Sequence, residues 1–193
     1  MRAKILALVV AMIACTPTLA QPQEARPGQP GWIADANGCR AWNANPEPDE
    51  TITWSGPCAN GYATGSGVLQ WFVNGVPGGR HQGEYRDGRQ NGPGIYEHRT
   101  GFYDGEWLDG EMHGPGFYIW ANGDEYRGEF RHGRRDGRGV YDWLNGDRYE
   151  GAWRDGLPNG LGTFRRDNGL ILTGEWANGS HPECVNCLRP VQR

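Results

Sequence analysis

A motif of glycine and aromatic residues recurs every 23 residues along most of this chain, and this period restricts the fold more than any other feature. The clearest copy begins at Tyr103 and reads Tyr-x-Gly-x-Trp-x-x-Gly-x-x-x-Gly-x-Gly. Its first glycine, Gly105, recurs as Gly128, Gly151 and Gly174. A fixed period of this length is typical of repeat proteins, in which each unit buries its apolar face against its neighbours. We therefore expect an elongated array rather than one globular core.

Turn residues divide each copy into two strands. Five full copies begin at Trp54, His81, Tyr103, Tyr126 and Tyr149, and a truncated sixth begins at Leu172. Most copies have a pair such as Asp109-Gly110 in the middle, and a pair such as Asn122-Gly123 joins one copy to the next. These pairs favour hairpins because both residues can adopt a positive φ. The expected fold is all-β: an elongated, open antiparallel sheet of stacked β-hairpins over residues 51–180.

Alternation along the expected strands assigns side chains to the two faces of the sheet. Tyr103 and Trp107 point to one face, and Glu106 points to the other. Repetition of this pattern predicts aromatic columns that fill the core, with Cys58 in an aromatic position of the first copy. The predicted core residues are Trp54, Tyr85, Tyr103, Trp107, Tyr126, Phe130, Tyr149, Trp153 and Trp176.

The N-terminal residues have the pattern of an export signal. A short basic segment is followed by the apolar run 5–14 and by small residues at 18–20, which is the order found in secretory signal peptides. A cut before Cys15 is the alternative, because residues 12–15 resemble the lipobox of bacterial lipoproteins, in which the cysteine is acylated. We expect an exported protein that is periplasmic or secreted, or else an outer-membrane lipoprotein.

The remaining organisation follows from composition. Residues 1–20 are the expected signal peptide, residues 21–50 a tether and cap, and residues 181–193 a tail with a Cys-x-x-Cys motif. Once the leader is removed, 17 arginines and 23 carboxylates remain, a net charge of −6. This balance argues against nucleic acid as a partner.

Four cysteines lie beyond the leader, and an oxidising compartment favours disulfides between them. We predict that Cys39 pairs with Cys58 and pins the cap over the edge of the first copy. Cys184 and Cys187 are expected to form a disulfide in the tail, with a partial metal site or a redox pair as the alternatives. A tetrahedral zinc site needs further ligands at suitable spacing, and a redox motif needs a thioredoxin-like context that this chain lacks.

Two groups of residues are candidates for contact with a partner. The arginines concentrated in one copy are Arg127, Arg131, Arg134, Arg135 and Arg138. They form either a solvated turn or a basic surface that grips an acidic partner or a lipid headgroup. Trp71, Trp120 and Trp143 lie on the second strands of their copies. They belong either to the core or to a groove that binds a ligand such as a carbohydrate.

The sequence contains no recognisable catalytic or cofactor-binding motif. A Gly-x-Ser-x-Gly nucleophile elbow is missing, and no lysine outside the leader could complete a phosphate-binding loop. Glu84, Glu106, Glu129 and Glu175 recur in one outward row, which fits the solvated face of a sheet better than a pair of catalytic carboxylates. We predict a protein that is not an enzyme, with no catalytic residue, no metal ligand and no cofactor.

The repeated motif resembles the MORN repeat (membrane occupation and recognition nexus) over about residues 54–179. The first copy, in which Trp54-x-Gly56 is followed by Cys58, is similar to copies in bacterial exported members. The resemblance implies a twisted open sheet of hairpins with a groove, used as a scaffold, a dimerisation surface or a contact for phospholipids. We therefore expect a non-catalytic scaffold of the cell envelope whose partner is a protein. A phospholipid-binding module and an aromatic-lined carbohydrate binder are the alternatives, and the exposed strand edges leave homo-oligomerisation open.

Overall fold

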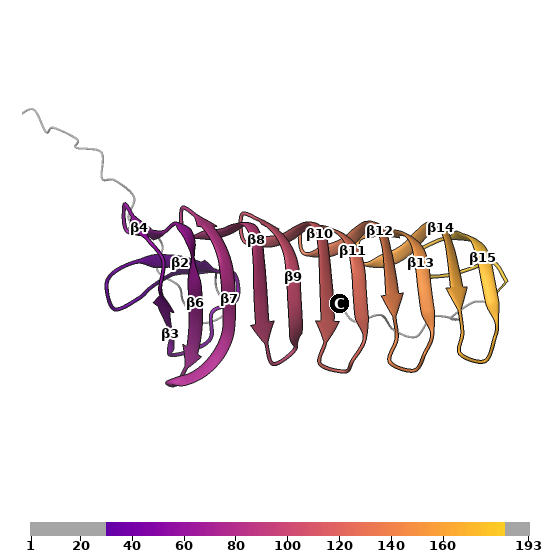
Figure 1. Cartoon of the computed structure of the whole chain (residues 1–193), viewed down its shortest axis with the longest axis horizontal. Coiled ribbons are helices and arrows are strands. Elements are labelled where there is room, and N and C mark those ends of the chain that lie inside the picture. Colours follow the sequence, from indigo (N-terminus) through magenta and orange to yellow (C-terminus); the bar gives the residue numbers. More distant parts are fainter. Residues whose placement is uncertain (1–29, 184–193) are drawn as a thin grey trace, which may run out of the picture.

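The computed structural model describes residues 30–183, which form two β-sheets and no helix (Figure 1). Eleven strands form one long sheet in which each strand is antiparallel to its neighbours. In chain order they are β3 (Glu50–Trp54), β6 (Gly65–Val73), β7 (Val76–Arg86), β8 (Arg89–His98), β9 (Gly101–Leu108), β10 (Glu111–Trp120), β11 (Glu125–Arg131), β12 (Arg134–Asp142), β13 (Arg148–Arg154), β14 (Leu157–Arg165) and β15 (Ile171–Trp176). The predicted open sheet of stacked hairpins is confirmed. No described residue belongs to a helix that is long and apolar enough to cross a membrane.

The turns within the copies have the backbone that the sequence predicts. Between β9 and β10, Asp109 and Gly110 have φ angles of 50° and 92°, the two positive values that a tight hairpin turn requires. The same combination occurs at Asn60-Gly61, Asp87-Gly88, His132-Gly133, Asp155-Gly156 and Asn178-Gly179. Such a turn also bonds to the preceding copy, since the N–H of Gly133 donates to the carbonyl of Met112 over 3.0 Å. Main-chain bonds therefore join successive copies outside the strands as well.

Among the turns between copies, Asn74-Gly75 has the two predicted positive φ angles, whereas the later Asn-Gly turns differ from the prediction. In the loop between β10 and β11, Gly123 has a φ of 87°, whereas Asn122 is not in the left-handed region. The side-chain oxygen of Asn122 instead accepts the N–H of Asp124 over 3.1 Å. A bond of 2.9 Å from the N–H of Trp120 to the carbonyl of Asp124 closes the loop. Asparagine favours this loop by bonding to the main chain two residues farther on.

A row of glycines crosses the long sheet and explains why the motif combines a first tyrosine with glycines at fixed spacing. Gly105 of β9 lies opposite Gly116 of β10, and further glycines continue the row on both sides. The Tyr103 ring covers this pair, because a Cβ atom on Gly116 would lie 2.5 Å from the Tyr103 hydroxyl oxygen. That hydroxyl donates a hydrogen bond to the Glu106 carbonyl over 3.0 Å. Equivalent bonds are made by Tyr126 and Tyr149.

Each of these tyrosine rings lies edge-on between two rings of the aromatic column that contains Trp107, Phe130 and Trp153. The Tyr126 ring lies 5.1 Å from Phe130 of its own copy and 5.3 Å from Trp153 of the next, at interplanar angles of 86° and 81°. Such edge-to-face pairs add roughly 0.5–1.5 kcal/mol to the burial of the rings. The structure buries all nine side chains predicted for the core: Trp54, Tyr85, Tyr103, Trp107, Tyr126, Phe130, Tyr149, Trp153 and Trp176.

A four-stranded sheet, here called the cap sheet, lies at the N-terminal end of the long sheet (Figure 1). Its strands are β1 (Gly31–Ala34), β2 (Arg40–Asn43), β4 (Cys58–Ala59) and β5 (Tyr62–Ala63). The predicted disulfide between Cys39 and Cys58 is confirmed. The placement of Cys58 in the aromatic column is wrong, because the chain leaves the long sheet after Trp54 and Cys58 is exposed in β4. The disulfide and the pairing of β5 with β2 hold this segment in the cap sheet instead.

Candidate functional site

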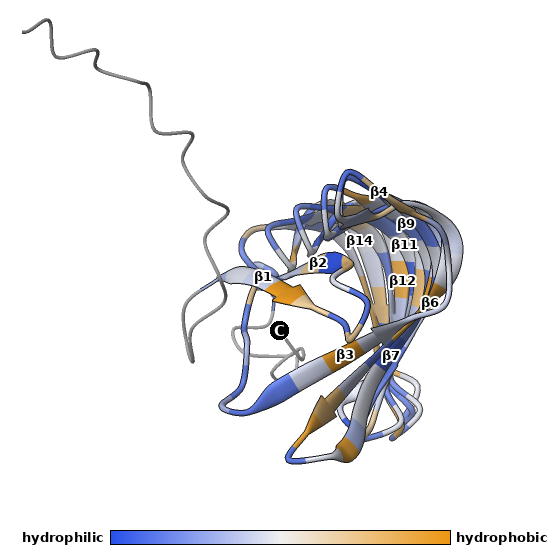
Figure 2. Ribbon diagram, turned by 90° about the vertical axis from the view of Figure 1, so that its left-hand side faces the viewer, coloured by the Kyte–Doolittle hydropathy of each residue, from blue (hydrophilic) through white to orange (hydrophobic). Residues whose placement is uncertain are grey.

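The concave face of the long sheet is the candidate functional surface. Seen end-on in Figure 2, the long sheet is curved, and β1 and β2 lie on the inner side of the curve. Two pockets are lined by side chains of the aromatic face. Residues 42–45 of the cap sheet and the loop after it line one of them, which places this pocket on the inner side of the curve. The aromatic face is therefore the concave one.

One pocket, here called the array pocket, has a volume of about 540 Å³ and is lined by residues of β10, β12 and β14. Trp120 forms an aromatic wall of this pocket. Its ring lies 4.4 Å from Tyr118 and 5.2 Å from Tyr141, tilted by 34° from each. Trp120 is half-buried, whereas Trp71 and Trp143 are buried. Of the three tryptophans considered for a groove, Trp71 and Trp120 line pockets, and Trp143 packs in the core.

Arg135 lies at the array pocket and is not part of an exposed basic surface, which corrects the sequence-based interpretation. It is only 4% exposed, and its Nη2 donates to the Gly156 carbonyl over 2.9 Å. Burial lowers the pKa of Arg135 to about 10, so the side chain remains charged at neutral pH. Its guanidinium carbon lies 5.0–5.8 Å from the centres of four rings: Trp120, Tyr126, Tyr141 and Trp153. Cation–π attraction to these faces stabilises the buried charge.

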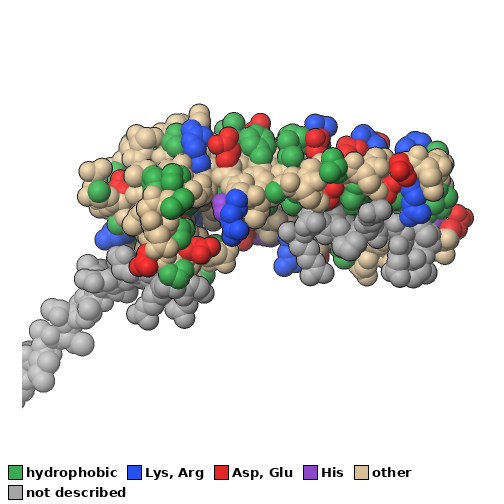
Figure 3. All heavy atoms as spheres, turned by 90° about the horizontal axis from the view of Figure 1, so that it is seen from below, with side chains coloured by type: hydrophobic (Ala, Val, Ile, Leu, Met, Phe, Trp, Pro, Cys, Tyr) green, Lys and Arg blue, Asp and Glu red, His purple; other side chains and the backbone are tan. Residues whose placement is uncertain are grey.

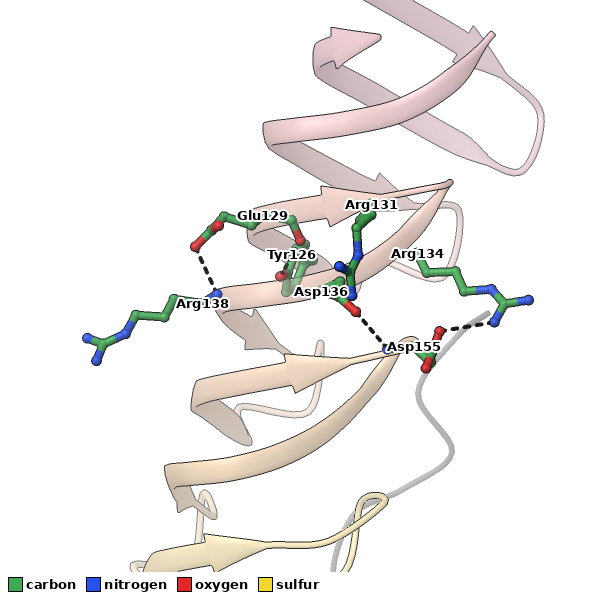
Figure 4. Close-up of polar contacts among 7 residues, drawn as sticks. All are labelled: Tyr126, Glu129, Arg131, Arg134, Asp136, Arg138 and Asp155. Atoms are coloured by element: carbon green, nitrogen blue, oxygen red, sulfur yellow. Dashed lines mark hydrogen bonds and ion pairs between the residues drawn. The ribbon is translucent and has the colours of Figure 1, made fainter. Parts of the chain in front are cut away.

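The other arginines of the predicted cluster do not form one basic surface. Arg131 pairs with Asp136 over 2.8 Å, and Arg134 pairs with Asp155 over 3.2 Å. Figure 4 shows the side chains of Arg134 and Arg138 extending in opposite directions. The two arginines are four residues apart in β12, and the register between β11 and β12 shifts between them, beside Gly137 with its φ of 111°. Spacing in the sequence therefore overstated the local density of positive charge.

Arg127 belongs to the convex face. Its guanidinium carbon lies 4.6 Å from the centre of the Phe117 ring on the neighbouring strand. Charged side chains of both signs are also interspersed over a different side of the molecule, which Figure 3 shows from below. Glu129, from the predicted outward row, accepts the N–H of Arg138 over 3.0 Å. Within residues 30–183, no group of three or more His, Cys, Asp or Glu side chains is arranged to hold a metal ion.

The second pocket was not foreseen from the sequence. We call it the cap cleft: a space of about 860 Å³ between residues 42–50 and the strands β6, β7 and β8. Glu50, Gln90 and Tyr96 are among its lining residues. One signal was present, because Gln90 is polar at an inward position where the next copy has Met112. Nothing in the repeat period predicts how the segment before it folds back over the sheet.

Two buried polar side chains depart from the repeat beside this cleft. His81 replaces the first tyrosine of the motif and is 0% exposed. Neither of its ring nitrogens nor the Tyr85 hydroxyl has a hydrogen-bond partner among the described residues. Burial lowers the pKa of His81 to about 4 and raises that of Tyr85. His81 is therefore neutral at physiological pH, packed between Tyr85 and Trp107 at centroid distances of 5.2 and 5.0 Å.

Several predicted features lie outside residues 30–183. These are the signal peptide, the possible acylation site Cys15, and the tail cysteines Cys184 and Cys187. The predictions for these residues stand as they were made from the sequence.

Comparison with protein-family models gives a match to the MORN repeat. The model matches four consecutive segments, at residues 81–101, 103–125, 126–148 and 149–171. No curated protein sequence matches the chain. The matched segments begin at the irregular copy that starts with His81, and they contain Trp120 and the five clustered arginines.

Proposed function

Since residues 81–171 are four consecutive MORN repeats, we propose that this protein is a non-catalytic scaffold that holds a protein partner against its concave face. MORN repeats occur in proteins that take part in membrane or protein interactions. The observation that carries the proposal is Trp120, a half-buried ring that opens into the array pocket between β10 and β12. Aromatic anchors in such hollows contribute most of the binding free energy in many protein interfaces.

The charges around the array pocket favour a protein over a lipid surface. The exposed guanidinium of Arg134 is already paired with Asp155, and both residues line the pocket. Anionic bilayers attract clusters of unpaired basic side chains. A protein partner needs only local complementarity to an apolar centre with a polar rim, and that is what Trp120, Leu157 and the Arg134–Asp155 pair provide.

Site-specific photocrosslinking in the source cells tests the proposal. A photoreactive amino acid replaces Met112, which lines the array pocket with Trp120, and Val140 on the convex face serves as the control position. We expect one defined adduct from position 112 and none from position 140. The adduct from position 112 should disappear when Trp120 is also changed to alanine. Equal adducts from both faces would contradict the proposal.

Three further measurements test the alternatives. Sedimentation with anionic liposomes that weakens in salt and on Arg134→Ala would favour a phospholipid contact instead. Hydrolysis by the purified protein that is lost on Glu106→Gln would overturn the non-catalytic assignment. Retention on polysaccharide that is lost on Trp120→Ala would favour a carbohydrate ligand.

The proposed location is the bacterial envelope, and it is supported by residues 1–20 of the sequence. The intact mass of the native protein, taken from soluble and membrane fractions, tests it. A soluble chain that begins at Gln21 indicates a periplasmic or secreted scaffold. A membrane-bound chain that begins at acylated Cys15 indicates a lipoprotein, and a chain that retains Met1 would contradict export.

A further inference from the structure

The cap cleft is a feature of this chain rather than of its repeats. It lies between the segment 42–50 and the concave face of β6, β7 and β8. A regular array would present only an open groove at this end. Here the segment between β2 and β3 supplies a second wall, and the enclosed volume of about 860 Å³ is large enough for a small molecule.

Aromatic rings line the sheet side of the cleft. Tyr96 lies at the centre of this wall, with its ring 5.9 Å from Trp71 and 6.1 Å from Trp107. Both tryptophans meet Tyr96 nearly edge-on, at 86° and 76°. Rings set at such angles offer faces in more than one direction, and ring faces attract cations that come within about 6 Å of the centroid.

Carboxylates line the opposite side. Glu50 is half-buried, and its Oε2 accepts hydrogen bonds from the Asn43 side chain over 2.7 Å and from the Glu47 N–H over 3.1 Å. Loss of solvent raises the pKa of Glu50, and these two hydrogen bonds offset only part of that effect. Glu47 adds a second, exposed carboxylate. Two groups oppose a cation at the same cleft: the exposed Arg99 and, when protonated, His98, whose ring is stacked on Tyr96 with the centroids 6.1 Å apart.

Gln90 supplies a polar group inside the cleft. The side chain is 8% exposed and lines the cleft, with its Oε1 near Gly110. Its amide atoms are not among the buried polar atoms that lack a partner, so the amide reaches the solvent of the cleft and can bond to a molecule that enters it. Its carbonyl oxygen can accept a hydrogen bond from an N–H group.

We propose that the cap cleft binds a small organic cation, an ammonium or guanidinium compound, between the Tyr96 wall and the Glu50 carboxylate. The aromatic faces and the carboxylate attract the positive charge from two sides, and Gln90 accepts a hydrogen bond from the ligand. A neutral sugar would leave the charge of Glu50 uncompensated. This binding site is separate from the array pocket proposed for a protein partner, so either assignment can fail without the other.

Calorimetric titration of the full mature chain tests the proposal. The probes are choline, agmatine and spermidine, with 3,3-dimethyl-1-butanol as the neutral isostere of choline and N-acetylglucosamine as a sugar. We expect at least one cation to bind, and choline, if it is the one, to bind about tenfold more tightly than its isostere. Indole N–H signals of Trp71 and Trp107 in NMR spectra should shift with the same affinity.

Matched variants locate the site. Glu50→Gln should weaken cation binding by about tenfold or more, and Gln90→Leu should weaken it as well. Glu150→Gln removes the same charge from the exposed convex side of β13 and should leave the affinity unchanged. Thermal melting checks that the variants fold. If Glu50→Gln does not fold, affinity measured against pH replaces it, for the wild type and for His98→Gln, which removes the histidine that lines the cleft. In both proteins the affinity should fall in acid as Glu50 takes up a proton.

Three results would overturn the proposal. The first is no heat and no NMR shift with any of the cations up to millimolar concentration. The second is equal binding of the isostere or tighter binding of the sugar. The third is an equal effect of Glu50→Gln and Glu150→Gln, or, where Glu50→Gln does not fold, an affinity of His98→Gln that does not change with pH.

Discussion

The copy that begins at Tyr126 and the copy that begins at His81 occupy equivalent places in the sheet but are stabilised differently. The Tyr126 hydroxyl donates to the Glu129 carbonyl over 3.0 Å. His81 has no hydrogen bond from either ring nitrogen within the described residues, and the nearby Tyr85 hydroxyl has none either. The motif tyrosine of a regular copy is therefore satisfied within the motif, although the Nε1 of Trp143 in the copy that begins at Tyr126 has no partner among the described residues. The irregular copy carries unsatisfied groups, and it lies where the cap sheet and the disulfide add support from outside the repeat.

This difference indicates where new function can arise in a repeat protein. Inside the array, a motif ring packs against its own copy and a neighbouring copy, as Tyr126 does with Phe130 and Trp153, so a substitution affects two units. At the N-terminal end one neighbour is replaced by the cap sheet, whose contacts need not follow the period. Gly88 shows this, since its N–H donates to the Ala63 carbonyl and its carbonyl accepts the Trp42 N–H. The cap cleft lies at this junction.

Gly116→Ala should give the largest loss of stability, because it places a methyl group inside the Tyr103 ring. The added carbon would lie 2.5–2.8 Å from ring and hydroxyl atoms of Tyr103, and the main chain behind the ring leaves it little room to move. We expect unfolding to become easier by about 3 kcal/mol. Urea denaturation followed by tryptophan fluorescence measures this change.

Gly78→Ala is the control from the irregular end. A Cβ atom there has its nearest neighbour at 3.6 Å, the carbonyl oxygen of Trp71, so the free energy of unfolding should change by less than about 0.5 kcal/mol. Equal effects of the two substitutions would show that the glycine row does not limit ring packing.

Acid should destabilise the copy that begins at His81 more than its regular neighbours. The folded pKa of His81 is about 4, against 6.5 for an ordinary histidine. The unfolded chain therefore takes up a proton first as the pH falls. Stability should decrease from about pH 6.5 to about pH 4 and then level off, by a total of about 3 kcal/mol from this group.

Reciprocal substitutions isolate this contribution. His81→Tyr should remove it and restore a hydroxyl that can bond to the carbonyl three residues on, as Tyr103 does. Tyr103→His should create a similar acid sensitivity in a regular copy. Denaturation curves between pH 4 and 7 make the comparison, and parallel curves for wild type and His81→Tyr would contradict it.

The sequence predicted the regular part of the molecule well because one rule is applied many times. Paired turns such as Asp109-Gly110 and inward rings such as Trp107 follow from local backbone chemistry and alternation, and repetition reinforces each assignment. The role of Cys58 was wrong because the disulfide and the cap sheet, not the period, decide where the chain goes after Trp54. The cluster of arginines was misjudged for another reason. Residues adjacent in sequence alternate between faces, so Arg135 is buried while Arg134 is exposed.

Removal of the disulfide tests how far the irregular end depends on support from outside the repeat. Cys39 and Cys58 are separated by 19 residues, and a cross-link that closes a loop of this size stabilises by about 2–3 kcal/mol, mainly through the unfolded chain. We expect the double variant Cys39→Ser and Cys58→Ser to melt at a lower temperature. Hydrogen exchange should increase in β1–β5 before it increases in β11–β14. Uniform loosening of all the strands would show that the cap sheet and the array unfold as one unit.

The smallest expected effects give the most direct comparison, because one hydroxyl group is removed in each region. Tyr126→Phe deletes the hydroxyl that bonds to Glu129 and should cost about 1 kcal/mol. Tyr85→Phe deletes a buried hydroxyl that lacks a partner among the described residues, so it should be neutral or stabilise the protein slightly. Both variants keep their aromatic packing. The difference between their changes in the free energy of unfolding therefore measures only the hydrogen bonding of the two hydroxyl groups. If Tyr85→Phe costs as much as Tyr126→Phe, then a buried water satisfies the Tyr85 hydroxyl, and the irregular copy is as well compensated as the regular ones.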